Sequence, residues 1–110
     1  MNVAHKELAS GRWSEMSFCE QMANVGSEVE RAISWRKKGN TTYSYKALER
    51  ALELLDLTIK DAEGKGKMKE LFRLREFMAD YFVFDNEYKS TDKSWNKYFY
   101  SFIYTSRMNR

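Results

Sequence analysis

This sequence has few of the residues on which catalysis and covalent cross-linking depend. It contains no proline, five glycines, one cysteine (Cys19) and one histidine (His5) among 110 residues. A single cysteine cannot form an internal disulfide framework, so we expect a reducing, cytoplasmic location. No apolar run approaches the ~20 residues of a membrane-spanning helix, and the first residues lack the apolar core of a signal peptide. We therefore expect no membrane association.

The same scarcity limits the reactions that the chain can carry out. Dinuclear metal sites in helical bundles need inward carboxylates and Glu-x-x-His pairs, a pattern that this sequence lacks. Cys19 lies at helical spacing among apolar residues, far along the chain from the histidine that would activate it, and is expected to be a buried structural thiol. We predict no catalytic residue, no metal and no cofactor, and favour a protein that is not an enzyme.

Apolar residues recur at steps of three and four in four segments, which is typical of amphipathic helices. We predict helices over about 15–38, from the low forties to about 60, over 67–84, and from about 91 to the end of the chain. The core stripe of the second helix is predicted to contain Tyr45, Leu48, Leu52, Leu55 and Ile59. The expected N-caps are Ser17 in a capping box with Glu20, then one of Thr41, Thr42 and Ser44, and finally Ser90 or Thr91.

Short connections between these segments favour antiparallel neighbours, so the predicted fold is all-α, an antiparallel up-and-down four-helix bundle. Residues 1–13 show no periodicity and are predicted to form an N-terminal arm, with residues 14–110 as a single domain. The third helix carries Phe72, Phe77, Val83 and Phe84 outside its main stripe, which is typical of a helix that is central or sits at an interface. From the aromatic surplus of the third and fourth helices we predict a homodimer. Exposure of Phe77, Phe84 or Tyr100 in a monomer would indicate its interface.

One candidate site is a cluster on the first helix. Glu28, Arg31 and Trp35 follow one another at steps of three and four, and Arg36 comes next. An arginine beside a tryptophan can stack on its ring and bind phosphate or carboxylate through two N–H groups. The cluster is predicted either to bind a small anion or partner, or to be an ion pair with a half-buried tryptophan.

Further candidates lie in the second half of the chain. Arg73 and Arg75 on the third helix can bind an anion, and Arg75 is expected to pair with an acid, with Glu28, Glu53 and Glu76 as candidates. Asp85 and Asn86 belong to a polar loop that either caps a helix or contacts a partner. Trp95, on the predicted inward face of the fourth helix, completes the set of candidate ligand- or partner-binding residues.

Charge gives a weak indication of an anionic partner. The formal net charge is +3, with 19 basic and 16 acidic residues, and acids alternate with bases as on a solvated surface. Tyr98, Tyr100 and Tyr104, near Lys97 and Arg107, either stack on single-stranded bases or belong to the core. Nucleic acid is thus an alternative partner, and its binding would weaken steeply with salt.

Several runs of the sequence resemble a family of small uncharacterised prokaryotic proteins. They are GSEVERAISWRKKGN (26–40), ALELLDLTI (51–59), DNEY (85–88) and STDKSW (90–95). More remotely, the layout looks like the helical HEPN proteins, which pair with minimal nucleotidyltransferases or act as ribonucleases. The ribonuclease members use an arginine followed four to six residues later by histidine. Here His5 precedes every arginine, so the resemblance implies a non-catalytic helical partner.

Two hypotheses about function follow. The first is a non-catalytic interaction module that associates with itself and binds a partner protein. The alternative is a non-catalytic, HEPN-like component of a nucleotide- or nucleic-acid-handling system that holds phosphate through the Arg/Trp cluster. Exposed aromatic residues would favour the first, and arginines that converge on a pocket would favour the second.

Overall fold

The computed structural model describes residues 11–108, and its regular elements are all helical. A 3-10 turn, η2 (Trp13–Glu15), precedes α1 (Phe18–Lys37), α2 (Thr41–Asp61), α3 (Met68–Phe82) and α4 (Asp92–Met108). No strand occurs between residues 11 and 108. Within this range, no helix combines the length and apolar character that crossing a membrane requires. The prediction of an all-α protein with four helices is confirmed.

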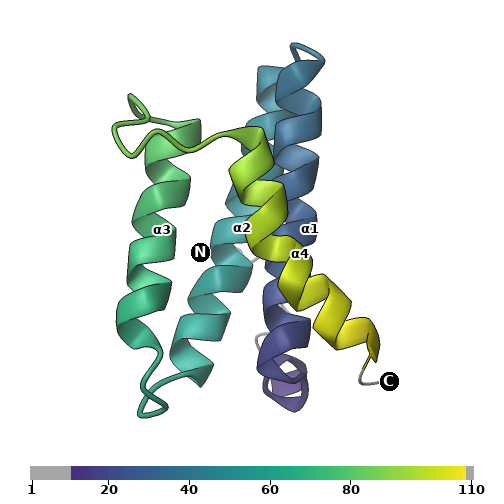
Figure 1. Cartoon of the computed structure of the whole chain (residues 1–110), viewed down its shortest axis with the longest axis vertical. Coiled ribbons are helices and arrows are strands. Elements are labelled where there is room, and N and C mark those ends of the chain that lie inside the picture. The colour runs from purple at the N-terminus through teal and green to yellow at the C-terminus, as the bar shows by residue number, and fades with distance from the viewer. Residues whose placement is uncertain (1–10, 109–110) are drawn as a thin grey trace.

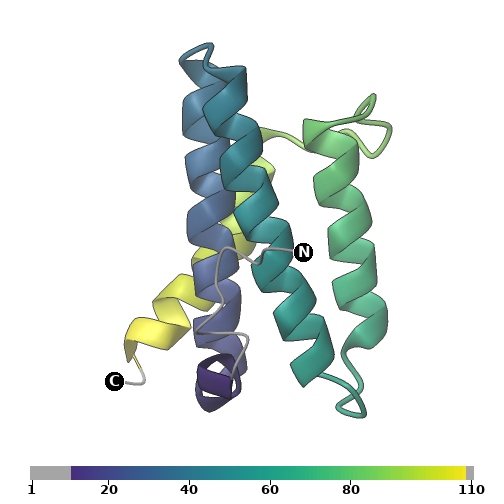
Figure 2. The same ribbon diagram turned by 180° about the vertical axis from the view of Figure 1, so that it is seen from behind.

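The four helices pack unequally. Consecutive helices alternate in direction, and α4 crosses the others at an angle (Figure 1). The close pairs are α1 with α2, which lie side by side in both views (Figure 2), α1 with α4 and, less extensively, α2 with α3. The backbones of α3 and α4 are not closely packed. The arrangement is therefore open along the side where these two helices face each other.

Two of the predicted N-caps are present. Ser17 Oγ accepts a hydrogen bond from the backbone N–H of Glu20 at 3.1 Å, and Glu20 Oε1 accepts one from the N–H of Ser17 at 3.2 Å. This reciprocal pair is the capping box that the sequence predicted. At α4, Thr91 Oγ1 accepts a hydrogen bond from the N–H of Ser94 at 3.0 Å.

The predicted cap of α2 is wrong. Asn40, rather than Thr41, Thr42 or Ser44, caps this helix by accepting a hydrogen bond from the backbone N–H three residues on. Ser44 is buried, and its hydroxyl donates to the carbonyl of Ala32 on α1 at 2.8 Å. The helix therefore begins earlier, and its serine links it to α1.

The predicted core stripe of α2 is also displaced at its start. Tyr45 is 48% exposed, whereas Ser44, Ala47 and Ala51 are buried. Small side chains at these positions let the backbones of α1 and α2 approach closely. A tyrosine would not fit in that contact, so it lies on the outer surface.

Trp13 corrects the predicted domain boundary. The predicted arm includes Trp13, but its side chain is only 2% exposed and belongs to the core. Trp13 Nε1 donates to Thr58 Oγ1 at 3.0 Å, and Gln21 Nε2 donates to the carbonyl of Trp13 at 2.9 Å. A single 3-10 turn has no helical periodicity, which is why the pattern missed it. Residues 1–10 of the predicted arm lie outside the described residues.

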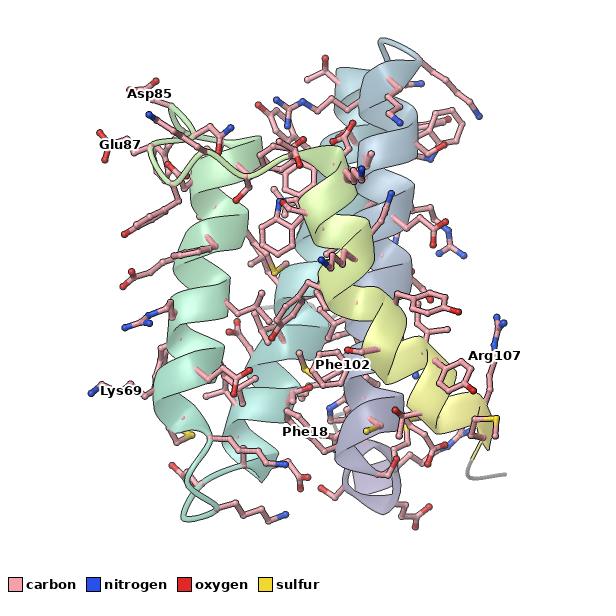
Figure 3. All side chains as sticks on the ribbon, viewed as in Figure 1. Phe18, Lys69, Asp85, Glu87, Phe102 and Arg107 are labelled. Carbon is pink, nitrogen blue, oxygen red and sulfur yellow. The ribbon has the colours of Figure 1, made fainter. Side chains whose placement is uncertain are left out.

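A glycine fixes the position of α4. A Cβ atom added at Gly26 would lie 2.7–2.8 Å from three carbons at the base of the Phe99 side chain, so glycine is required for this close crossing of α1 and α4. Further along α4, Phe102 packs edge-to-face on Phe18 of α1 with 5.9 Å between ring centroids (Figure 3). Both contacts hold α4 on α1 rather than on α3.

Candidate functional site

A cavity of about 380 Å³ lies between α3 and α4 on the open side of the molecule. We call it the α3–α4 groove. Residues of α3, of the loop that follows it and of α4 contribute to its lining. They are Glu70, Arg73, Leu74 and Phe77 of α3, Tyr88, Lys89 and Ser90 of the loop, and Ser94, Trp95 and Tyr98 of α4.

A stacked pair of rings forms one wall of the groove. The rings of Phe77 and Tyr88 are nearly parallel, with centroids 4.2 Å apart. The buried carboxylate of Asp80 holds the loop in this position by accepting hydrogen bonds from the backbone N–H groups of Glu87 at 2.8 Å and Tyr88 at 3.1 Å. The wall therefore depends on a fixed loop conformation.

Asn86 stabilises the same loop from within. Its side chain donates to the carbonyl of Ser90 and accepts from the N–H of Ser90, both at 2.9 Å. Its φ angle of 53° is left-handed, a conformation that asparagine tolerates better than most residues. Asp85 is exposed and, like Glu87, points away from the helices (Figure 3). Of the two predicted loop residues, Asn86 thus braces the loop, and neither lines the groove.

Aromatic residues of α4 form the opposite wall. Trp95 is 4% exposed and stacks on Phe99, and its ring meets that of Tyr98 edge-to-face at 6.5 Å. Trp95 Nε1 is buried and has no hydrogen-bond partner in the part of the chain that the structure describes. An unpaired buried donor costs roughly 1–3 kcal/mol.

The charged groups of the groove are not balanced. The hydroxyl of Tyr98 donates to Glu70 Oε1 at 3.4 Å. Burial, together with this carboxylate, raises the pKa of Tyr98 to about 12. The side chains of Arg73 and Lys89 have no ion-pair or hydrogen-bond partner among residues 11–108. Within the described part of the chain, the groove therefore presents two cations without an acid partner and one carboxylate, that of Glu70, which already accepts a hydrogen bond from Tyr98.

The nine predicted site residues separate into several places. Arg73 and Trp95 lie together in the groove, and Asp85 and Asn86 lie in its loop. Glu28, Arg31 and Trp35 lie instead at the junction of α1 and α2. There the buried carboxylate of Glu28 accepts from Arg31 Nη1 at 2.6 Å.

Glu28 also has a partner that the sequence did not predict. Its second oxygen, Oε2, accepts from Arg50 Nε of α2 at 2.9 Å. Trp35, partly buried, packs edge-to-face on Tyr43 of α2, with ring centroids 4.9 Å apart. The predicted ion pair of the cluster is therefore present, and a second ion pair connects Glu28 to α2.

Arg36 does not belong to this cluster. It lies one residue after Trp35, which turns its side chain by about 100° around the helix. Its Nη1 donates to the carbonyl of Tyr81 at 3.1 Å, and its guanidinium lies over the rings of Tyr81 and Phe82. The hydroxyl of Tyr81 in turn donates to Asp92, and burial together with that carboxylate raises the pKa of Tyr81 to about 12. Arg36 thus links α1 to the end of α3.

The predicted partners of Arg75 are wrong. Its Nε donates to Asp56 Oδ1 of α2 at 2.9 Å, rather than to Glu28, Glu53 or Glu76. Because α3 packs on α2, the nearest acid is the one that faces it there. This hydrogen bond raises the pKa of Arg75 above its ordinary value. Arg75 therefore contacts neither the groove nor the Glu28 cluster.

Sequence reasoning missed most of the groove. The sequence pattern predicts Tyr98 in the core or in base stacking, and it gives no indication of Glu70 or Lys89. One signal was available, because Phe77 lay outside the main stripe of its helix. The contact between Phe77 and Tyr88 could not be inferred, since it depends on how the loop folds back.

Comparison with protein-family models, with curated proteins and with solved structures found no match to this chain. The resemblance to a prokaryotic family and to HEPN proteins therefore stays a prediction. Within residues 11–108, no group of three or more histidine, cysteine, aspartate or glutamate side chains is placed to hold a metal ion. Cys19 is a free thiol and is only partly buried.

The raised pKa of Tyr98 leads to a test of the groove's interior. Between pH 10 and about 12 the folded protein keeps the Tyr98 proton while the unfolded chain, with the ordinary value of 10.0, releases it. The stability linked to Tyr98 is thus complete below pH 10 and is lost as the pH rises toward 12. We expect the wild type to lose more unfolding free energy over this interval than Tyr98→Phe, measured by urea denaturation. Equal losses in the two proteins would contradict this position of Tyr98.

Proposed function

We propose that this protein is a non-catalytic interaction module whose α3–α4 groove binds a helical segment of a partner protein. The observation that carries the proposal is an aromatic-walled cavity of about 380 Å³ whose two cations have no partner among the described residues. The segment would place an apolar or aromatic side chain in the groove and a carboxylate at its rim.

The apolar lining supports this mode of binding. Cavities that hold drug-sized groups are about 300–1,000 Å³, mostly apolar, with a few placed polar groups. The α3–α4 groove has this size and composition, with Leu74, Phe77 and Trp95 beside a few polar groups.

Charge favours an acidic partner. Arg73 and Lys89 are both exposed, and Glu70 already accepts from Tyr98. A carboxylate on the partner would meet two cations that no acid of the described chain neutralises. A basic segment would meet the same cations with repulsion, so the rim provides selectivity.

A second surface supports self-association through α4. Tyr100 and Tyr104 are 62% and 54% exposed and stack on one another at 6.1 Å. Phe84 is exposed as well, whereas Phe77 is partly covered by Tyr88. Tyr100 and Tyr104 lie on a different face of α4 from Trp95 and Tyr98. We infer that this tyrosine pair meets its copy in a homodimer and leaves the groove free.

The groove can be tested with two synthetic helical peptides that differ only in charge. Both peptides carry a leucine and a tryptophan one helical turn apart. These two residues are flanked by glutamates in the acidic peptide and by lysines in the basic peptide. We expect the acidic peptide to bind about tenfold more tightly, because two exposed ion pairs contribute about 0.2–1 kcal/mol each. In Arg73→Glu this preference should disappear. Isothermal titration calorimetry gives both affinities.

Lys69→Glu is the matched control for that experiment. Lys69 is exposed on the same helix but points away from α4 (Figure 3). The control should keep the preference of the wild type. An equal loss of preference in both variants would show that only net charge matters, and absence of binding by both peptides would contradict the proposal.

The dimer has an independent test by analytical ultracentrifugation. The double variant Tyr100→Glu/Tyr104→Glu should shift the protein to monomer, because like charges would then face each other across the interface. Tyr45→Glu on α2 is the control, since this tyrosine is 48% exposed and lies on another helix. A wild type that sediments as a monomer at all concentrations would contradict self-association.

A further inference from the structure

A second cavity, of about 210 Å³, lies on the outer surface of α1 and α2, and we call it the α1–α2 notch. It is lined by Trp35, Tyr43, Lys46 and Arg50, two aromatic rings and two cations. Its volume is below the range of about 300–1,000 Å³ that encloses a drug-sized ligand. The notch therefore suits one portion of a ligand, with the rest lying over the adjoining surface.

Glu28 positions the arginine of the notch. Its two oxygens are each occupied, one by Arg31 and the other by the Nε–H of Arg50. An arginine has five N–H donors in a fixed fork. The remaining N–H groups of Arg50 have no hydrogen-bond acceptor within the described part of the chain. Arg50, about one third exposed, is thus held by a buried acid and keeps donors for a ligand.

Cations are in excess around the notch. Four cations lie in or beside it, namely Arg31, Lys38, Lys46 and Arg50. Within the described residues, Glu28 forms ion pairs with Arg31 and Arg50. Neither lysine has an acid partner within residues 11–108. Their ammonium groups lie instead over aromatic rings, Lys38 over Trp35 at 5.1 Å and Lys46 over Tyr43 at 5.5 Å. This excess of positive charge favours an anion.

The relative strengths of two contacts indicate what kind of anion. A lysine over an exposed ring contributes about 0.5–1 kcal/mol. A nucleobase stacked on an aromatic side chain contributes about 1–3 kcal/mol. A base can therefore replace Lys38 on the ring of Trp35, while Lys46 and Arg50 line the same notch and can hold a phosphate of that ligand.

We propose that the α1–α2 notch binds a nucleoside phosphate, with the base stacked on Trp35 and the phosphate held by Arg50 and Lys46. The same chemistry is offered by a free mononucleotide and by single-stranded nucleic acid. The proposal is independent of the α3–α4 groove, which lies between other helices. It also differs from the predicted Arg/Trp cluster, because Lys46 and Arg50 of α2 replace Arg36.

Calorimetry with AMP, ribose 5-phosphate and a single-stranded hexanucleotide tests the proposal. We expect AMP to bind about tenfold more tightly than ribose 5-phosphate, because only AMP has a base to stack. Trp35→Leu should abolish this difference and leave the ribose 5-phosphate affinity unchanged. Lys46→Glu should weaken both ligands about tenfold or more.

Lys69→Glu on α3 is the control for charge, since it makes the same change away from the notch. Circular dichroism of each variant establishes that the helices are intact. Tighter binding of the hexanucleotide than of AMP, with a steep salt dependence, would assign the notch to nucleic acid, and tighter AMP binding would assign it to free nucleotides. Equal affinities for AMP and ribose 5-phosphate, or equal effects of Lys46→Glu and Lys69→Glu, would overturn the proposal.

Discussion

The close crossing of α1 and α4 at Gly26 is the constraint on which the rest of the structure depends. Because Gly26 has no side chain, the base of Phe99 lies directly against the backbone of α1. Phe102 extends the contact by packing on Phe18. These contacts take α4 across α1, so it cannot also pack along α3. Because α4 packs on α1 rather than on α3, the side between α3 and α4 stays open and forms the groove.

The remaining helix, α3, is held by polar contacts in addition to its buried apolar side chains. Arg75 pairs with Asp56 of α2, and Arg36 reaches from α1 to the carbonyl of Tyr81. The buried carboxylate of Asp80 fixes the loop that leads to α4. These contacts hold α3 and the loop in place beside the groove, and the aromatic side chains that line the groove do not fill it. The side chains of Arg73 and Lys89 line this groove and have no ion-pair partner within the described residues.

The sequence predicted the local structure well and the relations between helices poorly. Periodicity and the Ser17–Glu20 spacing predicted helices and a cap because these depend on residues within a few positions of one another. Trp13 was missed because one 3-10 turn has no period. The groove was missed because no pattern within one helix encodes the angle at which α4 crosses α1. The partners of Glu28 and Arg75 likewise depend on which helices are neighbours.

The most direct test of this account is a double-mutant cycle of Gly26→Ala and Phe99→Ala, measured by urea denaturation in one stabilising osmolyte buffer. Alanine is favoured over glycine in a helix by about 1 kcal/mol, whereas overpacking costs about 1–3 kcal/mol. We predict that Gly26→Ala destabilises the protein when Phe99 is present and destabilises it less when Phe99 is alanine, because alanine removes two of the three close carbons and keeps only Cβ. Effects of Gly26→Ala that agree within about 0.5 kcal/mol in the two backgrounds would contradict it.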